Sequence, residues 1–94
     1  MVKVIATSVF YEETVEEAKK LYANLVEETR KEEGCIAYNL YQDTKDKCVL
    51  VMIEEWENNE SLELHMKSPH FTDIVPKIGK LRKSGEITTY DLIY

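Results

Sequence analysis

The chain has 94 residues, of which 44% are hydrophobic and 32% charged, and its formal net charge is −6. This size and composition predict a single globular domain, residues 1–94, with a small hydrophobic core. The negative charge argues against nucleic acids and anionic membrane surfaces as partners, because both attract basic proteins.

The N-terminal part begins with a strand and a helix. Residues 2–10 are rich in β-branched side chains, which predicts a strand with two largely apolar faces. This segment lacks the features of a signal peptide, and no apolar run approaches the roughly 20 residues that span a bilayer, so we expect a cytoplasmic protein. Residues 13–34 predict an amphipathic helix, with Thr14 and Glu17 spaced as a capping box and Gly34 placed for a left-handed cap.

Residues 35–43 and 48–56 predict two strands that a short polar turn joins into an antiparallel hairpin. A turn centred between residues 45 and 46 pairs Asn39 with Met52 and Cys35 with Trp56. Opposed residues point the same way, so one face carries a mixed set of side chains: Ala37, Asn39, Tyr41, Leu50, Met52, Glu54 and Trp56. The two cysteines, Cys35 and Cys48, lie at opposite ends of this hairpin, too far apart for a disulfide.

The C-terminal part predicts two helices and a last strand. Residues 58–68 predict a short helix, and residues 68–83 a second helix that Ser68 caps and Pro69 begins. Pro76 is expected to kink or divide this second helix. Gly85 is expected to break the chain just before a final strand, residues 86–94.

The resulting order, β-α-β-β-α-β with a broken second helical region, predicts an α+β fold of the ferredoxin-like class. Its four-stranded antiparallel sheet would have helices on one face only. The other face is too apolar to be left in water, so we expect a homodimer in which two sheets pack face to face.

Several spaced motifs resemble the antibiotic biosynthesis monooxygenase (ABM) domain family. They are "RKEEGCIAYNLYQD", "EEW" and "SLELHMKSPHF", which hold Glu32, Gly34, Cys35, Tyr38, Glu54, Trp56, Leu62, His65, Pro69, His70 and Phe71. Glu33 departs from the family pattern, in which a proline is usual, and this concerns the turn more than any chemistry. The resemblance covers nearly the whole chain.

The resemblance implies a dimeric α/β barrel and several kinds of activity. The family includes quinol and polyketide monooxygenases that need neither metal nor flavin, haem-degrading enzymes, and an isomerase of a phosphorylated sugar. The haem-degrading branch uses a histidine ligand at the position that aligns with Val75 of this chain, so we do not expect haem. The resemblance to the monooxygenases that need neither metal nor flavin implies that no other cofactor is required. Fold is therefore better specified than function.

Candidate catalytic residues are His65, His70 and Asn39. His65 lies three residues after Leu62 on the sheet-facing side of its helix, where a neutral imidazole could take a proton from a substrate hydroxyl. His70 lies in a first helical turn, as a second pocket group or as a capping residue. Asn39 could orient a substrate oxygen. The competing interpretation of the histidines and of Asn39 is structural: buried polar groups that find partners within the protein.

Candidate substrate-binding residues are Trp56, Tyr41, Met52 and Phe71. Trp56 could stack on an aromatic ring, although a structural anchor is the commoner role. Glu54 could act as an acid or base, but a surface or paired carboxylate is the commoner case.

Metal binding is not expected, because the two histidines are five residues apart across a helix break and no acidic i+4 partner completes a ligand set. Among the activities of the family that it resembles, the chain is expected to carry out cofactor-independent oxidation of a small aromatic or quinol-like molecule by O2. The alternatives are an isomerase of a small hydroxyketone, with Lys67, Lys77 or Lys80 near a phosphate, and a non-catalytic dimeric module that binds a small molecule.

Overall fold

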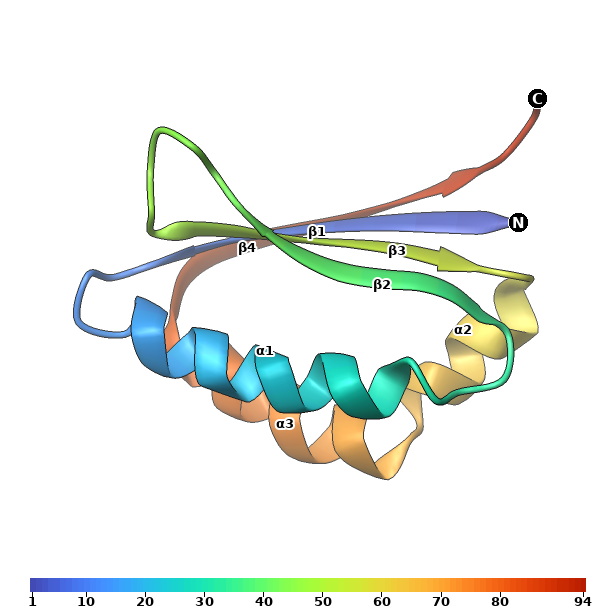
Figure 1. The fold of residues 1–94 in the computed structure, drawn as a ribbon, viewed down its shortest axis with the longest axis horizontal. Coiled ribbons are helices and arrows are strands. Elements are labelled where there is room, and N and C mark those ends of the chain that lie inside the picture. Colours follow the sequence, from blue (N-terminus) through green and yellow to red (C-terminus); the bar gives the residue numbers. More distant parts are fainter.

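The computed structural model describes residues 1–94 and contains four strands and three helices. The elements are β1 (Val2–Phe10), α1 (Val15–Thr29), β2 (Cys35–Gln42), β3 (Val49–Trp56), α2 (Asn59–Met66), α3 (Pro69–Leu81) and β4 (Arg82–Asp91). All strand pairs are antiparallel, and the strand order is β2-β3-β1-β4. Figure 1 shows the helices on one side of the sheet and the other side uncovered. The predicted ferredoxin-like α+β fold is confirmed.

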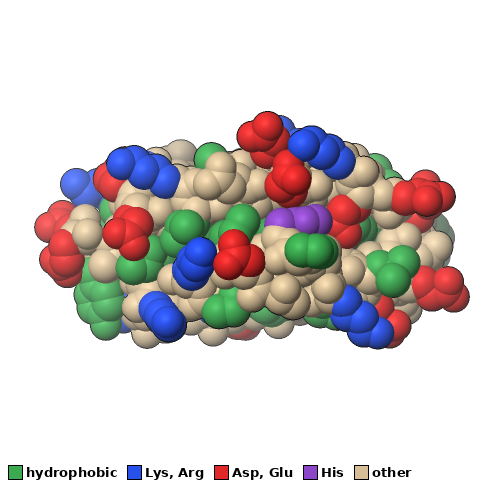
Figure 2. All heavy atoms as spheres, turned by 90° about the horizontal axis from the view of Figure 1, so that it is seen from below, with side chains coloured by type: hydrophobic (Ala, Val, Ile, Leu, Met, Phe, Trp, Pro, Cys, Tyr) green, Lys and Arg blue, Asp and Glu red, His purple; other side chains and the backbone are tan.

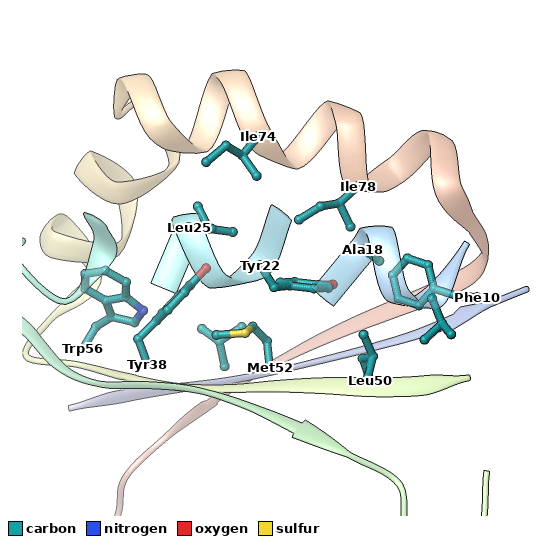
Figure 3. Close-up of a cluster of buried hydrophobic side chains, with 12 residues drawn as sticks. Phe10, Ala18, Tyr22, Leu25, Tyr38, Leu50, Met52, Trp56, Ile74 and Ile78 are labelled. Atoms are coloured by element: carbon teal, nitrogen blue, oxygen red, sulfur yellow. The ribbon is translucent and has the colours of Figure 1, made fainter. Parts of the chain in front are cut away.

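The core fills the space between the sheet and the helices. Alternate residues of β1 are buried on the helix-covered face, and Phe10 packs edge-on against Tyr22 of α1. Figure 3 shows Tyr38 and Met52 rising from the sheet while Tyr22 and Leu25 reach toward them from α1. These four side chains also line the cavity described below.

The local expectations for Thr14 and Gly85 were wrong. Thr14 precedes α1 but makes no capping bond; its hydroxyl instead donates to the carbonyl of Leu81 at 2.9 Å, which ties α1 to the end of α3. Pro76 lies inside α3 without dividing it. Gly85 does not precede β4 but pairs with Ser8 within it, so the last strand begins four residues earlier than predicted.

The predicted register of the β2–β3 hairpin was also wrong. Cys35 does oppose Trp56, as expected, but the register shifts between Cys35 and Ala37, so that Asn39 pairs with Ile53. The extra residue in β2 is a β-bulge, and it turns every later side chain of this strand to the opposite face. Tyr38, not Asn39, therefore lies on the helix-covered face.

Both cysteines are free and half-buried, as expected. None of the three helices is both long and apolar enough to cross a membrane.

Candidate functional site

A cavity of about 350 Å³ lies between the sheet and the helices α1 and α3. Most of its lining is apolar, and three aromatic side chains contribute to it: Tyr22, Tyr38 and Phe71. The other lining residues are Ala6, Thr7, Ser8, Leu25, Met52, Glu54, Val75, Ile78, Arg82, Gly85, Glu86 and Ile87. A cavity of this size and character suits a small, mostly apolar molecule.

Glu54 is the buried carboxylate of this cavity. Side chains alternate between the two faces along β3, and Glu54 points to the helix-covered face, where only 7% of the residue is exposed. The indole N–H of Trp56, two residues along the same strand, donates to Glu54 Oε1 at 3.0 Å. Burial raises the pKa of Glu54 to about 7, against the opposing effect of this hydrogen bond. The carboxylate thus changes charge near neutral pH.

A second polar group, the Glu32–His65–His70 cluster, lies at the junction of the α1–β2 loop with α2 and α3. Glu32 Oε2 is 2.6 Å from His65 Nδ1 and 2.8 Å from His70 Nε2. An ionised carboxylate only accepts hydrogen bonds, so both ring nitrogens donate to it. Figure 2, which views the helix-covered side, shows a small histidine surface beside acidic side chains; His65 is 1% exposed, so this surface belongs to His70.

Local sequence signals bring these three residues together. Gly34 has a φ of 86°, which allows the loop after α1 to turn sharply, and a Cβ at this position would overlap the side chain of Ser61 in α2. Ser68 caps α3: its hydroxyl accepts from the Phe71 N–H at 3.3 Å and lies 3.1 Å from His70 Nε2. The tight loop and the capped helix start therefore fix both sides of the cluster.

Its buried environment disfavours the charged form of His65. Burial lowers its pKa, although the contact with Glu32 opposes that effect. With the proton held at Nδ1, the other ring nitrogen, Nε2, is buried and has no hydrogen-bond partner. The ring packs among Tyr38, Trp56 and Phe71 at centroid distances of 5.3, 4.6 and 5.0 Å.

The geometric reason for expecting no metal was wrong, because the three potential ligand atoms lie within 4.8 Å of one another. Their spacing nevertheless fits hydrogen bonds better than a shared metal. Metal–ligand bonds of about 2.0–2.2 Å in a tetrahedral site separate the ligand atoms by roughly 3.3–3.6 Å. Glu32 Oε2 is only 2.6 and 2.8 Å from the two nitrogens.

The cluster and the cavity are neighbours but not one site. Neither His65 nor His70 lines the cavity. Tyr38 and Phe71 border both: their rings pack against His65, and they form part of the cavity wall. The cluster thus packs against the outer side of two residues of the cavity wall, Tyr38 and Phe71.

The predicted substrate-binding residues divide into two groups. Met52 and Phe71 line the cavity, as expected. Trp56 is fully buried and does not line it, so it anchors the structure and holds Glu54. Tyr41 is 50% exposed, away from the cavity, because of the shifted register.

The same shift removes Asn39 from the helix-covered face. Its side-chain oxygen accepts from Arg30 at 2.8 Å, and it does not line the cavity. The three lysines considered for phosphate binding, Lys67, Lys77 and Lys80, do not line it either; Arg82 is its basic residue.

Sequence reasoning assigned no role to two residues of this region, Glu32 and Tyr38. Glu32 follows the end of α1, which has no basic residue in its last turn. A negative charge is unfavourable near a helix C-terminus, but Glu27, Glu28 and Glu33 lie near the same end, so the sequence did not single out Glu32. Tyr38 could have been found only from the position of the bulge.

Comparisons with known proteins agree with one another. Residues 1–77 match the family model described as "Antibiotic biosynthesis monooxygenase". A solved structure titled "Crystal structure of antibiotic biosynthesis monooxygenase" is 38% identical, with a TM-score of 0.94 and 100% of both chains covered. A conserved protein from Methanosarcina mazei Go1 is 40% identical, with a TM-score of 0.92, covering 95% of this chain and 89% of that one.

Among curated proteins, sll1783 of Synechocystis sp. is 33% identical over 78 residues. The alignment covers 82% of this chain but 53% of that protein. The chain thus spans about half the length of the curated relatives it matches.

Proposed function

Because the chain belongs to the antibiotic biosynthesis monooxygenase family, we propose that it oxidises a small aromatic, quinol-like molecule with O2 in the cavity between the sheet and the helices. The family match and the similar solved structure support a monooxygenase-type function in general. The observation that supports this substrate class is the cavity itself, which is mostly apolar, bordered by aromatic rings and about 350 Å³ in volume.

The proposed reaction needs no bound cofactor, because the substrate supplies the electrons. Loss of a hydroxyl proton makes the ring of a quinol electron-rich enough to reduce O2 directly. One oxygen atom enters the ring and the other leaves as water, so a quinol and O2 give a hydroxylated quinone and H2O. The protein has to bind the ring, exclude bulk water and accept the proton.

The catalytic roles first predicted for His65 and His70 require contact with the substrate, and neither residue lines the cavity. We instead assign the Glu32–His65–His70 cluster the task of holding the wall residues Tyr38 and Phe71 in place. This assignment rests on the ring contacts of His65 and on the two hydrogen bonds of Glu32.

We also propose a homodimer that forms through the uncovered face of the sheet. This face carries half-buried aliphatic side chains from the two central strands, Ile5, Val9, Val51 and Ile53, and the exposed ring of Tyr90 from β4. An apolar surface of this kind on a small domain is typical of an interface. Packing of two sheets face to face would add to the limited core of a 94-residue chain.

A cavity-filling substitution tests the proposed function. Oxygen uptake is measured with a panel of simple benzo- and naphthoquinols for the wild type, Met52→Trp and Met66→Trp. Met52 lines the cavity, whereas Met66 is 45% exposed on α2 and so provides the same substitution outside it.

We expect uptake by the wild type and by Met66→Trp, and a loss of most of it in Met52→Trp with the fold retained by circular dichroism. No uptake with any quinol, or equal rates in the two variants, would contradict the proposal.

A further inference from the structure

The carboxylate of Glu54 is unusual among the acidic residues of this chain because it is buried in an apolar cavity. The residue is 7% exposed, and no lysine, arginine or histidine forms an ion pair with it. Glutamate is seldom buried unless it is paired, because removing its charge from water is costly. A buried, unpaired carboxylate that lines a cavity calls for a ligand-directed explanation.

The hydrogen bonding of Glu54 is incomplete in a way that suits a ligand. The indole Nε1–H of Trp56 donates a hydrogen bond to Glu54 Oε1 at 3.0 Å, and this is the side-chain hydrogen bond that the carboxylate accepts within the protein. The second oxygen, Oε2, accepts no bond from another side chain. The indole thus fixes the direction of the carboxylate and leaves one oxygen free to accept a hydrogen bond from a bound molecule.

We propose that Glu54 is the general base of the cavity and that its free oxygen takes the proton of an aromatic hydroxyl; this rests on the proposed oxidation. The O–H bond of the substrate breaks and an O–H bond to the Glu54 carboxylate forms. The electron pair stays on the substrate oxygen, so an aryloxide (a phenolate anion) and a neutral carboxylic acid result. No electron leaves the substrate in this step, and O2 is the oxidant of the step that follows.

Burial gives Glu54 a proton affinity suited to this task. Its pKa of about 7 means that the carboxylate is largely ionised at pH 8 and yet accepts a proton more readily than an exposed glutamate. The proton it receives must be released before the next turnover, and a base that titrates near neutral pH can release it to solvent.

The other titratable and charged groups around the cavity suit this role less well. Burial raises the pKa of Tyr38, which faces Glu54 across the β2–β3 pair, so its hydroxyl stays protonated. Tyr22 reaches the cavity from α1, and Arg82 and Glu86 reach it from β4. Glu86 is exposed to solvent, unlike Glu54. Glu32 acts on Glu54 only through its charge, which adds to the raised pKa.

The assignment predicts a preference that can be measured without turnover. A base that accepts an O–H proton should bind a phenol better than the methyl ether of that phenol, which has no proton to donate. The probes are 2-naphthol and 2-methoxynaphthalene, and their dissociation constants are measured by equilibrium dialysis at pH 5.5 and pH 8. The proteins are the wild type, Glu54→Gln and the control Glu55→Gln, whose carboxylate is on the neighbouring residue of β3.

We expect the wild type to prefer 2-naphthol by about tenfold or more at pH 8, as for a hydrogen bond to a charged group, and by clearly less at pH 5.5. Glu55→Gln should behave like the wild type. Glu54→Gln should show a smaller preference that no longer changes with pH. Equal binding of both probes by the wild type, an unchanged preference in Glu54→Gln, or no saturable binding of either probe would overturn the assignment.

Two outcomes separate this inference from the proposed function. If no quinol is oxidised but the wild type shows the Glu54-dependent preference, the proposed oxidation is wrong and the assignment of Glu54 as the proton acceptor is right. If quinols are oxidised and Glu54→Gln retains both the rate and the preference, the oxidation is right and the assignment of Glu54 is wrong.

Discussion

Replacing Glu54 by glutamine should change the pH dependence of stability in a calculable way. The buried carboxyl of the folded protein has its pKa raised from an ordinary 4.5 to about 7. At about 1.4 kcal/mol for each tenfold change in proton affinity, this corresponds to about 3 kcal/mol. Because the folded state holds the proton more tightly than the unfolded state, the contribution is complete below pH 4.5 and is lost as the pH rises through 7.

The stability of Glu54→Gln relative to the wild type should therefore increase as the pH rises. Glutamine has almost the same shape and keeps an oxygen that can accept from Trp56, but it does not titrate. Its second group is an amide N–H2, which costs a constant amount at every pH. The difference in unfolding free energy between Glu54→Gln and the wild type should move by about 3 kcal/mol in favour of the variant between pH 4.5 and pH 8.

Urea unfolding at one fixed protein concentration, at a series of pH values, measures this difference. Fixing the concentration matters because a dimer adds a concentration-dependent term to the apparent stability. Glu55→Gln serves as the control, and its unfolding free energy relative to the wild type should change little between pH 4.5 and pH 8. A difference between Glu54→Gln and the wild type that stays constant from pH 4.5 to pH 8 would refute the claim that burial in the cavity controls this carboxyl.

Four further predictions concern the loop, the cluster, the indole and the uncovered sheet. Glu32→Gln removes two charge-assisted hydrogen bonds and should lower stability by about 2–4 kcal/mol; an unchanged melting temperature would contradict it. Gly34→Ala should cost at least about 1–2 kcal/mol, because φ is 86° and the new methyl group overlaps Ser61; a neutral effect on urea unfolding would refute this. Trp56→Phe should move the pH midpoint of the 2-naphthol preference upward. The indole N–H stabilises the charged form of Glu54, so removing it should raise the pKa of this carboxyl further; an unchanged midpoint would argue against this role of the indole. Sedimentation should show a dimer at micromolar concentration, and a stable monomer would exclude the proposed interface.

Much of the fold could be predicted because its determinants are local. The alternation in β1, the helical periodicity before Thr29 and the cap at Ser68 each depend on residues a few positions apart. The register of β2 could not be predicted in this way. A bulge adds a single residue near Ile36 without disturbing the hydrophobic pattern, yet it exchanges the faces of Tyr38 and Asn39.

The candidate site was predicted less well because it depends on contacts between distant segments. Glu32 meets His65 and His70 across 33 and 38 residues of sequence, and no spacing rule encodes such a contact. The prediction that His65 faces the sheet was useful, since it packs on Tyr38 and Trp56. Its predicted contact with a substrate has no support here, because His65 does not line the cavity.

Glu54 illustrates how context decides between a surface role and a catalytic one. Its position in β3 was known from the sequence, and glutamate there is more often exposed or paired. Only the packing of α1 and α3 over the strand encloses the carboxylate, leaving the indole N–H of Trp56 as its donor. The chemistry therefore arises from tertiary structure.

The initial rate of oxygen uptake by Glu54→Gln, compared with the wild type at pH 8 and saturating quinol, tests the central claim most directly. Removing a general base typically lowers the rate by about 10²- to 10⁴-fold, and we expect a loss in that range while Glu55→Gln keeps the wild-type rate. Uptake by Glu54→Gln at the wild-type rate would contradict the account.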